Sequence, residues 1–239
     1  MKNQNIVILH GWNLSGKRFD PLARIFKKMG YRVSAPDFPG FGDEPAPVVP
    51  WHVSDYAKFL HTYIEKNRIN NPILVGHSFG GRVALKYAQL YPSDIKKIIL
   101  TGTPGFSPIP SKKLRFFLVI SKIGGALFAL PGLNIVADKA RKWLYYVAGA
   151  REFLRAEGSM RQTFKYIVSD DLVDSMEAVQ VPTMLVWGEN DTIVPVSIAK
   201  RMLTAIPESR LFIIPESDHG VPFRQPELFV SCVKQFLQG

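Results

Sequence analysis

Short apolar segments with strand character alternate with segments of helical periodicity along most of the chain, and this alternation constrains the fold most strongly. Strands are predicted at residues 5–9, 31–35, 72–75, 97–101, 183–187 and 211–214. Helices are predicted at residues 19–29, 53–66, 81–90, 197–206 and 226–237. Parallel strands need crossover connections, which helices usually supply. The chain therefore predicts an α/β fold with a mainly parallel sheet of about six strands and helices on both faces.

The alternation is interrupted between the fourth and fifth predicted strands. Residues 104–176 show no clear strand and read as several helices separated by prolines and glycines. The length of 239 residues suits one domain with a subdomain inserted into it. We therefore expect a core formed by residues 1–103 and 177–239, with residues 104–176 as a helical insertion.

A serine lies between the third strand and the helix that follows it. The segment Gly76-His77-Ser78-Phe79-Gly80 matches the pattern G-x-S-x-G, with an apolar strand directly before it and a helix directly after it. This setting is typical of a nucleophile elbow, a strained turn that projects the serine hydroxyl above the sheet edge. Because the turn leaves no room for a Cβ two residues on either side, glycines are expected there. Ser78 is thus the predicted nucleophile.

A serine nucleophile needs a general base, which is usually a histidine near neutral pH. The chain has five histidines: His10, His52, His61, His77 and His219. Only His219 follows the last predicted strand, at the same sheet edge as the serine. His10 is expected to brace the loop after the first strand, and His77 to support the elbow.

An acid that orients the base should follow another strand. The fifth strand leads into a turn that contains Glu189 and Asp191. We choose Asp191 and keep Glu189 as the rival. The chain order of Ser78, Asp191 and His219 then agrees with the order serine, acid, histidine of the α/β hydrolases.

Negative charge that develops on a substrate carbonyl oxygen needs N–H donors, which form an oxyanion hole. One predicted donor is the backbone N–H of Phe79, directly after the nucleophile. The other is the backbone N–H of Trp12 in the loop after the first strand, where Gly11 allows close approach of the backbone. This mechanism requires no metal and no organic cofactor, and none is expected.

Together these motifs resemble the α/β hydrolase superfamily. The matching segments are His10-Gly11-Trp12, Asp37-Phe38-Pro39-Gly40-Phe41-Gly42, Gly76-His77-Ser78-Phe79-Gly80-Gly81, Gly188-Glu189-Asn190-Asp191 and Asp218-His219-Gly220. The resemblance implies the α/β hydrolase fold, with residues 104–176 as a cap over the active site. It implies a serine hydrolase, because dehalogenases and epoxide hydrolases of this superfamily carry an aspartate at the nucleophile position.

The substrate class follows less directly from the sequence. Apolar side chains of the cap are predicted to line the substrate pocket, in particular Phe116, Phe128, Trp143 and Tyr146; the alternative is that they pack the cap against the core. We expect cleavage of carboxylic esters with small to medium acyl or aryl groups through an acyl-enzyme. The alternatives are a C–C bond hydrolase, a hydrolase of carrier-protein-linked acyl esters or thioesters, and a ligand-sensing receptor without rapid hydrolysis.

The charge of the chain bears on possible partners. The net charge is +10, and residues 111–142 are rich in lysine and arginine. This pattern indicates either a solvated helix face or a cap that docks an acidic protein or an anionic surface. No nucleic-acid-binding motif and no membrane-spanning segment is predicted, and a cytoplasmic location is the default expectation. The single cysteine, Cys232, is interpreted as a small buried apolar residue of the last helix.

Overall fold

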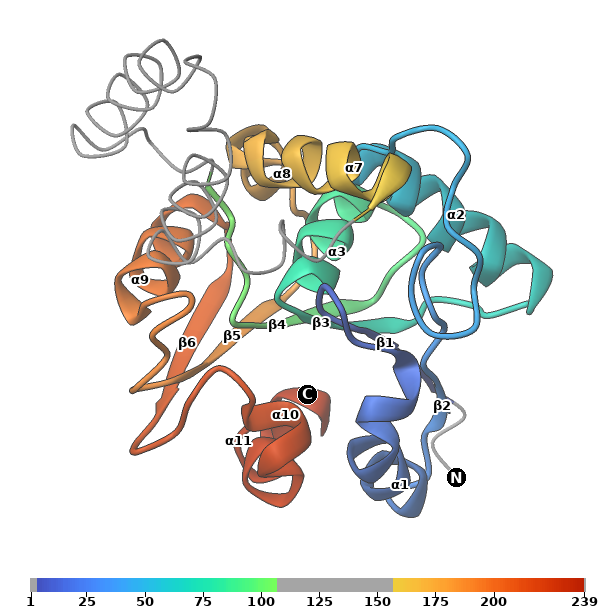
Figure 1. The fold of residues 1–239 in the computed structure, drawn as a ribbon. Coiled ribbons are helices and arrows are strands. Elements are labelled where there is room, and N and C mark those ends of the chain that lie inside the picture. The colour runs from blue at the N-terminus through green and yellow to red at the C-terminus, as the bar shows by residue number, and fades with distance from the viewer. Residues whose placement is uncertain (1–3, 107–156, 239) are drawn as a thin grey trace, which may run out of the picture.

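The computed structural model describes residues 4–106 and 157–238 (Figure 1). Its centre is a six-stranded sheet with the order β2-β1-β3-β4-β5-β6, and every neighbouring pair is parallel. The strands are β1 (Asn5–Leu9), β2 (Arg32–Ser34), β3 (Ile73–His77), β4 (Lys97–Thr101), β5 (Thr183–Gly188) and β6 (Ser209–Ile214). The sequence-based prediction of an α/β fold with about six strands is confirmed.

Helices cover both faces of the sheet (Figure 1). One face carries α1 (Asp20–Lys28), the short α10 (Val221–Arg224) and α11 (Pro226–Gln238). The other carries α2 (Val53–Lys66), α3 (Phe79–Leu90), α8 (Val173–Glu177) and α9 (Val196–Ala205). Successive side chains of a strand point to opposite faces, so a buried strand such as β1 contributes Ile6 and Ile8 to one hydrophobic cluster and Val7 and Leu9 to the other. This explains why the inner strands are apolar at nearly every position.

Helix α7 (Gly158–Ser169) lies above the sheet on the side of α2 and α3 (Figure 1). Two hydrogen bonds connect it to the loop before α2: Trp51 N–H donates to Thr163 Oγ1 at 2.9 Å, and Ser159 Oγ donates to the Pro47 carbonyl. Helix α7 and all but the last residue of α8 fall within residues 104–176, which were predicted to be helical. The division into a core and a cap at residues 104 and 176 stays a prediction.

Two elements were not predicted from the sequence: a 3-10 helix, η1 (Gly16–Phe19), and the helix α10. Strand β3 continues through His77, and α3 begins at Phe79, so that only Ser78 separates them. Within the described ranges, no helix is long and apolar enough to be a membrane span, and no three His, Cys, Asp or Glu side chains form a group that could hold a metal ion.

Candidate active site

Ser78 occupies a sharp turn between β3 and α3. Its backbone has φ 52° and ψ −114°, a conformation that is strained for a residue with a side chain. Its N–H donates to the carbonyl oxygen of Thr101, the last residue of β4, at 2.9 Å. This strain is what a nucleophile elbow requires, and the half-buried side chain lies at the carboxyl end of the sheet, where open α/β folds bind ligands.

The glycines around Ser78 are there because other chain segments come very close. A Cβ on Gly80 would overlap the carbonyl oxygen of Leu9 in β1, and a Cβ on Gly76 would lie 2.6 Å from the Cα of Gly81. The elbow therefore packs closely against both β1 and its own helix, α3. This packing explains the G-x-S-x-G spacing in physical terms.

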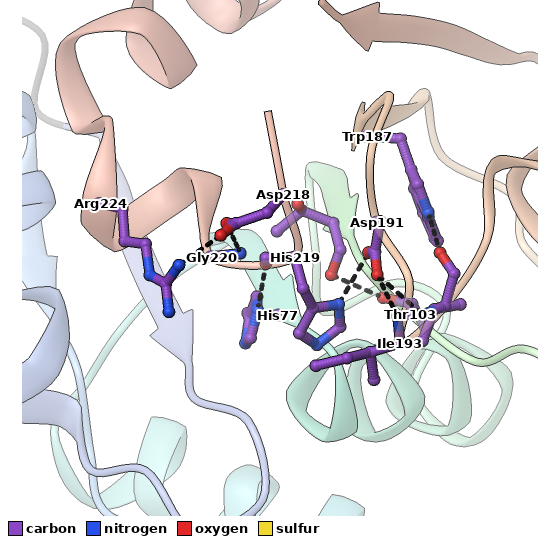
Figure 2. Close-up of polar contacts among 11 residues, drawn as sticks. His77, Thr103, Trp187, Asp191, Ile193, Asp218, His219, Gly220 and Arg224 are labelled. Atoms are coloured by element: carbon purple, nitrogen blue, oxygen red, sulfur yellow. Dashed lines mark hydrogen bonds and ion pairs between the residues drawn. The ribbon is translucent and has the colours of Figure 1, made fainter. Parts of the chain in front are cut away.

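His219 and Asp191 form a close pair at the same edge of the sheet (Figure 2). The Nδ1 atom of His219 lies 2.7 Å from Oδ2 of Asp191. Because the carboxylate accepts, Nδ1 carries the hydrogen, and Nε2 of His219 is left as the basic nitrogen. The histidine side chain is 14% exposed and the aspartate side chain only 1%. A shielded, hydrogen-bonded carboxylate of this kind orients the imidazole and stabilises its protonated form.

Gly102 brings the histidine next to the strand that supports the serine. It follows Thr101 directly and has φ 55°. A Cβ at this position would lie 2.6 Å from Nδ1 and from Cε1 of His219. The loops after β4, β5 and β6 therefore converge, and the carbonyl that binds Ser78 N–H is one residue away from the glycine that faces the His219 ring.

The rival acid and the other histidines of the sequence analysis lie in different surroundings. Glu189 is exposed, and its Oε2 accepts from the N–H of Glu216 at 3.2 Å. His61 on α2 stacks on Tyr91 with ring centroids 3.8 Å apart, and His52, just before α2, stacks on Tyr166. Of the two acids considered, only Asp191 is bonded to His219.

His10 braces the loop after β1, as expected. Its Nε2 accepts from the N–H of Phe38 at 2.9 Å, so its Nδ1, 2.8 Å from the carbonyl oxygen of Gly11, carries the hydrogen. Burial lowers the pKa of His10, and the ring is neutral. It therefore holds the loop with Trp12 against the segment after β2.

The two predicted oxyanion donors lie on adjacent segments. Phe79 is the first residue of α3, and an N–H in the first turn of a helix has no acceptor within the helix. The Trp12 ring packs on that of Phe79 with centroids 5.6 Å apart. It also contacts Phe164 of α7 at 5.0 Å, a neighbour that the sequence did not reveal because the two residues are 152 positions apart.

The predicted pocket residues Phe116, Phe128, Trp143 and Tyr146 lie outside the described residues. A cavity of about 600 Å³ opens nearby, between η1, α10 and the loops after β1 and β2. Its lining comprises Asn13, Leu14, Ser15, Arg18, Gly40, Phe41, Gly42, Phe223 and Arg224. None of the three predicted catalytic residues lines this cavity.

Comparison with known proteins agrees with this architecture. The "Uncharacterized hydrolase YugF" of Bacillus subtilis is 27% identical over 98% of this chain and 90% of its own length. A 2-hydroxy-6-oxononadienedioate/2-hydroxy-6-oxononatrienedioate hydrolase of Klebsiella pneumoniae is 26% identical, over 98% of this chain and 87% of the relative. The solved esterase of Exiguobacterium antarcticum superposes with a TM-score of 0.76 at 24% identity, over 99% of this chain and 92% of that chain.

A family model gives the same result over nearly the whole sequence. The model described as "Alpha/beta hydrolase family" matches residues 6–231, which include every strand but the first residue of β1 and extend into α11. The chain belongs to the α/β hydrolase family.

Proposed function

We propose that the protein is a serine hydrolase that cleaves carboxylic esters through an acyl-enzyme. Ser78 Oγ attacks the ester carbonyl carbon while Nε2 of His219 accepts its proton, and Asp191 stabilises the resulting imidazolium. The imidazolium then gives the proton to the departing alkoxide, and water attacks the acyl-enzyme by the same route in reverse. The observation that carries the proposal is the 2.7 Å bond from His219 Nδ1 to Asp191 Oδ2, at the same sheet edge as the strained turn in which Ser78 has φ 52°.

The proposed substrates carry small to medium acyl or aryl groups. The support within the described residues is the group of aromatic rings beside the elbow, where Trp12 contacts Phe41, Phe79 and Phe164. Such rings favour apolar substrate groups over charged ones. The backbone N–H groups of Trp12 and Phe79 are the proposed oxyanion donors.

The test of the nucleophile is covalent labelling by a fluorophosphonate probe. The full-length protein should be labelled, and Ser78→Ala should not. Ser231→Ala removes an exposed serine on α11 and is the matched control, which should be labelled like the unmodified protein. Equal labelling of Ser78→Ala and the unmodified protein would contradict the assignment. A labelled protein that turns over no ester, thioester or C–C substrate would instead favour a ligand-sensing receptor.

A second candidate is C–C bond hydrolysis, which is favoured by the name of the Klebsiella pneumoniae relative. The two activities are separated by a panel of p-nitrophenyl esters of increasing acyl length, acyl thioesters and a 2-hydroxy-6-oxo-dienoic acid. Ester hydrolysis is expected, with kcat/KM highest for a short or medium chain. Turnover of the dienoic acid alone would replace the ester proposal. The proposed docking of an acidic carrier protein rests on residues 111–142, outside the described residues, and stays a prediction.

A further inference from the structure

His77, the residue before the proposed nucleophile, is bonded to the backbone of the proposed base. It is the last residue of β3 and is buried, with 2% of its surface exposed. Its Nε2 lies 3.0 Å from the carbonyl oxygen of His219 (Figure 2). Because a carbonyl oxygen only accepts, Nε2 carries the hydrogen and donates it. The contact spans 142 positions of the sequence and joins the elbow to the loop after β6.

The imidazole of His77 is also enclosed on its other sides. Its ring packs against Phe19 and Phe223, at centroid distances of 5.8 and 5.4 Å, and lies 4.8 Å from the His219 ring. A Cβ on Gly11 would lie 2.8 Å from Nδ1 of His77. The side chain thus touches the loop after β1, the elbow and the loop after β6, which are the three segments that carry the proposed oxyanion loop, nucleophile and base.

We propose that His77 is a positioning residue that holds the backbone of His219, so that the imidazole of His219 keeps one orientation between Asp191 and Ser78. This inference rests on the proposed function. Asp191 fixes the His219 ring through Nδ1, whereas His77 fixes the main chain from which that ring projects. Catalytic groups displaced by about 1 Å can lose about 100-fold in rate, so a main-chain anchor of this kind matters for turnover.

The role requires a neutral His77, and its surroundings keep it neutral. Burial, together with smaller contributions from the neighbouring His219 and His10, lowers the pKa of His77 to about 3, although the hydrogen bond to the His219 backbone acts in the opposite direction. A neutral ring adds no positive charge beside the imidazolium that forms on His219 during the reaction. It also does not compete with His219 as a base.

Two substitutions separate the hydrogen bond from the packing. His77→Leu removes the donor and fills part of the buried space with an apolar side chain, whereas His77→Gln keeps an N–H donor of comparable reach. Phe26→Leu is the matched control, because Phe26 is fully buried in the cluster on the same sheet face and does not bond to the active-site loops. Circular dichroism at increasing temperature establishes that each full-length variant is folded at the assay temperature.

The kinetic readouts are the fluorophosphonate labelling rate of Ser78 and the ester kcat and KM between pH 5 and 9. For His77→Leu we expect kcat and the labelling rate to fall about 10- to 100-fold, with KM changed less than about two-fold. The pH profile of kcat should also change in His77→Leu, because the imidazole no longer keeps its place between Asp191 and Ser78. His77→Gln should recover most of the rate, and Phe26→Leu should lose stability with an unchanged pH profile.

Hydrogen exchange gives a readout that does not need activity. Peptides that contain His219 should exchange faster in His77→Leu than in the unmodified protein and in His77→Gln. If the unmodified protein neither reacts with the probe nor hydrolyses esters, the proposed function fails, whereas local exchange still decides whether His77 anchors the loop. Folded His77→Leu with unchanged labelling, pH profile and exchange would overturn the inference. Equal losses of kcat and of the labelling rate in His77→Leu and His77→Gln would also overturn it, because they would assign the effect to packing.

Discussion

The carboxylate of Asp191 is bonded on both oxygens. Oδ2 accepts from His219, and Oδ1 accepts from the backbone N–H groups of Ile193 and Val194 at 2.9 and 2.8 Å (Figure 2). The side chain is therefore held in one orientation, with its second oxygen aimed at the imidazole.

Replacement of this carboxylate tests its role directly. Asp191→Asn should lower kcat by about 10³- to 10⁴-fold, because an amide at this position no longer favours the His219 tautomer with a free Nε2. Glu189→Gln is the matched control, since Glu189 is exposed, lies in the same turn and bonds to Glu216 N–H. It should change kcat less than about two-fold. Steady-state hydrolysis of a p-nitrophenyl ester measures both, and the reverse ranking of the two variants would make Glu189 the acid.

One side chain of helix α3 bonds to two segments that lie near the two ends of the predicted insertion, residues 104–176. Arg82, one turn after Ser78, is buried and donates to the carbonyl oxygens of Pro104 and Asp170. Asp170 in turn accepts from Val53 N–H, at the start of α2, at 3.1 Å. The net effect of burial, which lowers the pKa of Arg82, and of the nearby Asp170 and Asp171, which raise it, is a pKa of about 10, so the guanidinium stays charged at neutral pH. The Arg82 side chain therefore connects α3 to the segments around Pro104 and Asp170, and Asp170 connects them to α2.

Loss of this guanidinium should be costly. Arg82→Met leaves two carbonyl groups without their charged donor, and we expect the free energy of unfolding to fall by about 2–4 kcal/mol. Lys86→Met, on the same helix but with a partly exposed side chain bonded to Gln89, should change it by less than about 0.5 kcal/mol. Urea unfolding followed by circular dichroism measures both values. A loss for Arg82→Met no greater than that for Lys86→Met would show that the two bonds do not stabilise the fold.

Elements whose limits are set by local sequence were predicted well. The bounds of β1, α2 and β4 agree with those expected from periodicity and breakers. Strand β6 starts two residues before the predicted start because it is an edge strand, in which exposed Arg210 alternates with partly buried neighbours. The helix α10 was missed because it is one turn long, and η1 because no periodicity marks so short a segment.

The residues of the candidate site likewise divide into those that local sequence reveals and those that depend on the packing of distant segments. A motif and chain order were enough to choose Ser78, Asp191 and His219, since each of them follows a recognisable strand. The bond from His77 to the His219 carbonyl and the contact of Phe164 with Trp12 depend on distant segments that pack together. No pattern within a short window of sequence carries that information.

For the molecule as a whole, the two buried histidines link stability to pH. His10 and His77 both have a pKa lowered from 6.5 by burial, to about 3 for His77. In the unfolded chain both rings take up protons as the pH falls through about 6.5, whereas in the native protein they do so only at lower pH. The unfolded state then binds more protons, and stability is lost as the pH decreases below about 6.5.

The expected outcome is a lower free energy of unfolding at acid pH, with a contribution from each histidine of at most about 1.4 kcal/mol per pH unit. Glutamine does not titrate, so His77→Gln should show a shallower decrease than the unmodified protein between about pH 6 and 4. Urea unfolding at several pH values in this range measures the difference. Carboxyl groups contribute equally to both proteins. Parallel curves would indicate that His77 takes up its proton in the native state.

The order of the strands along the chain also determines when, during translation, the residues of the candidate site become available. The turn around Ser78 is complete once β3 and α3 have been translated, but the proposed catalytic residues Asp191 and His219 follow β5 and β6, 113 and 141 positions after the serine. The segment that bears the histidine pairs with the elbow across 142 positions. A fragment released from the ribosome before β6 would therefore carry the proposed nucleophile without the proposed base, and the proposed hydrolysis would require translation beyond His219.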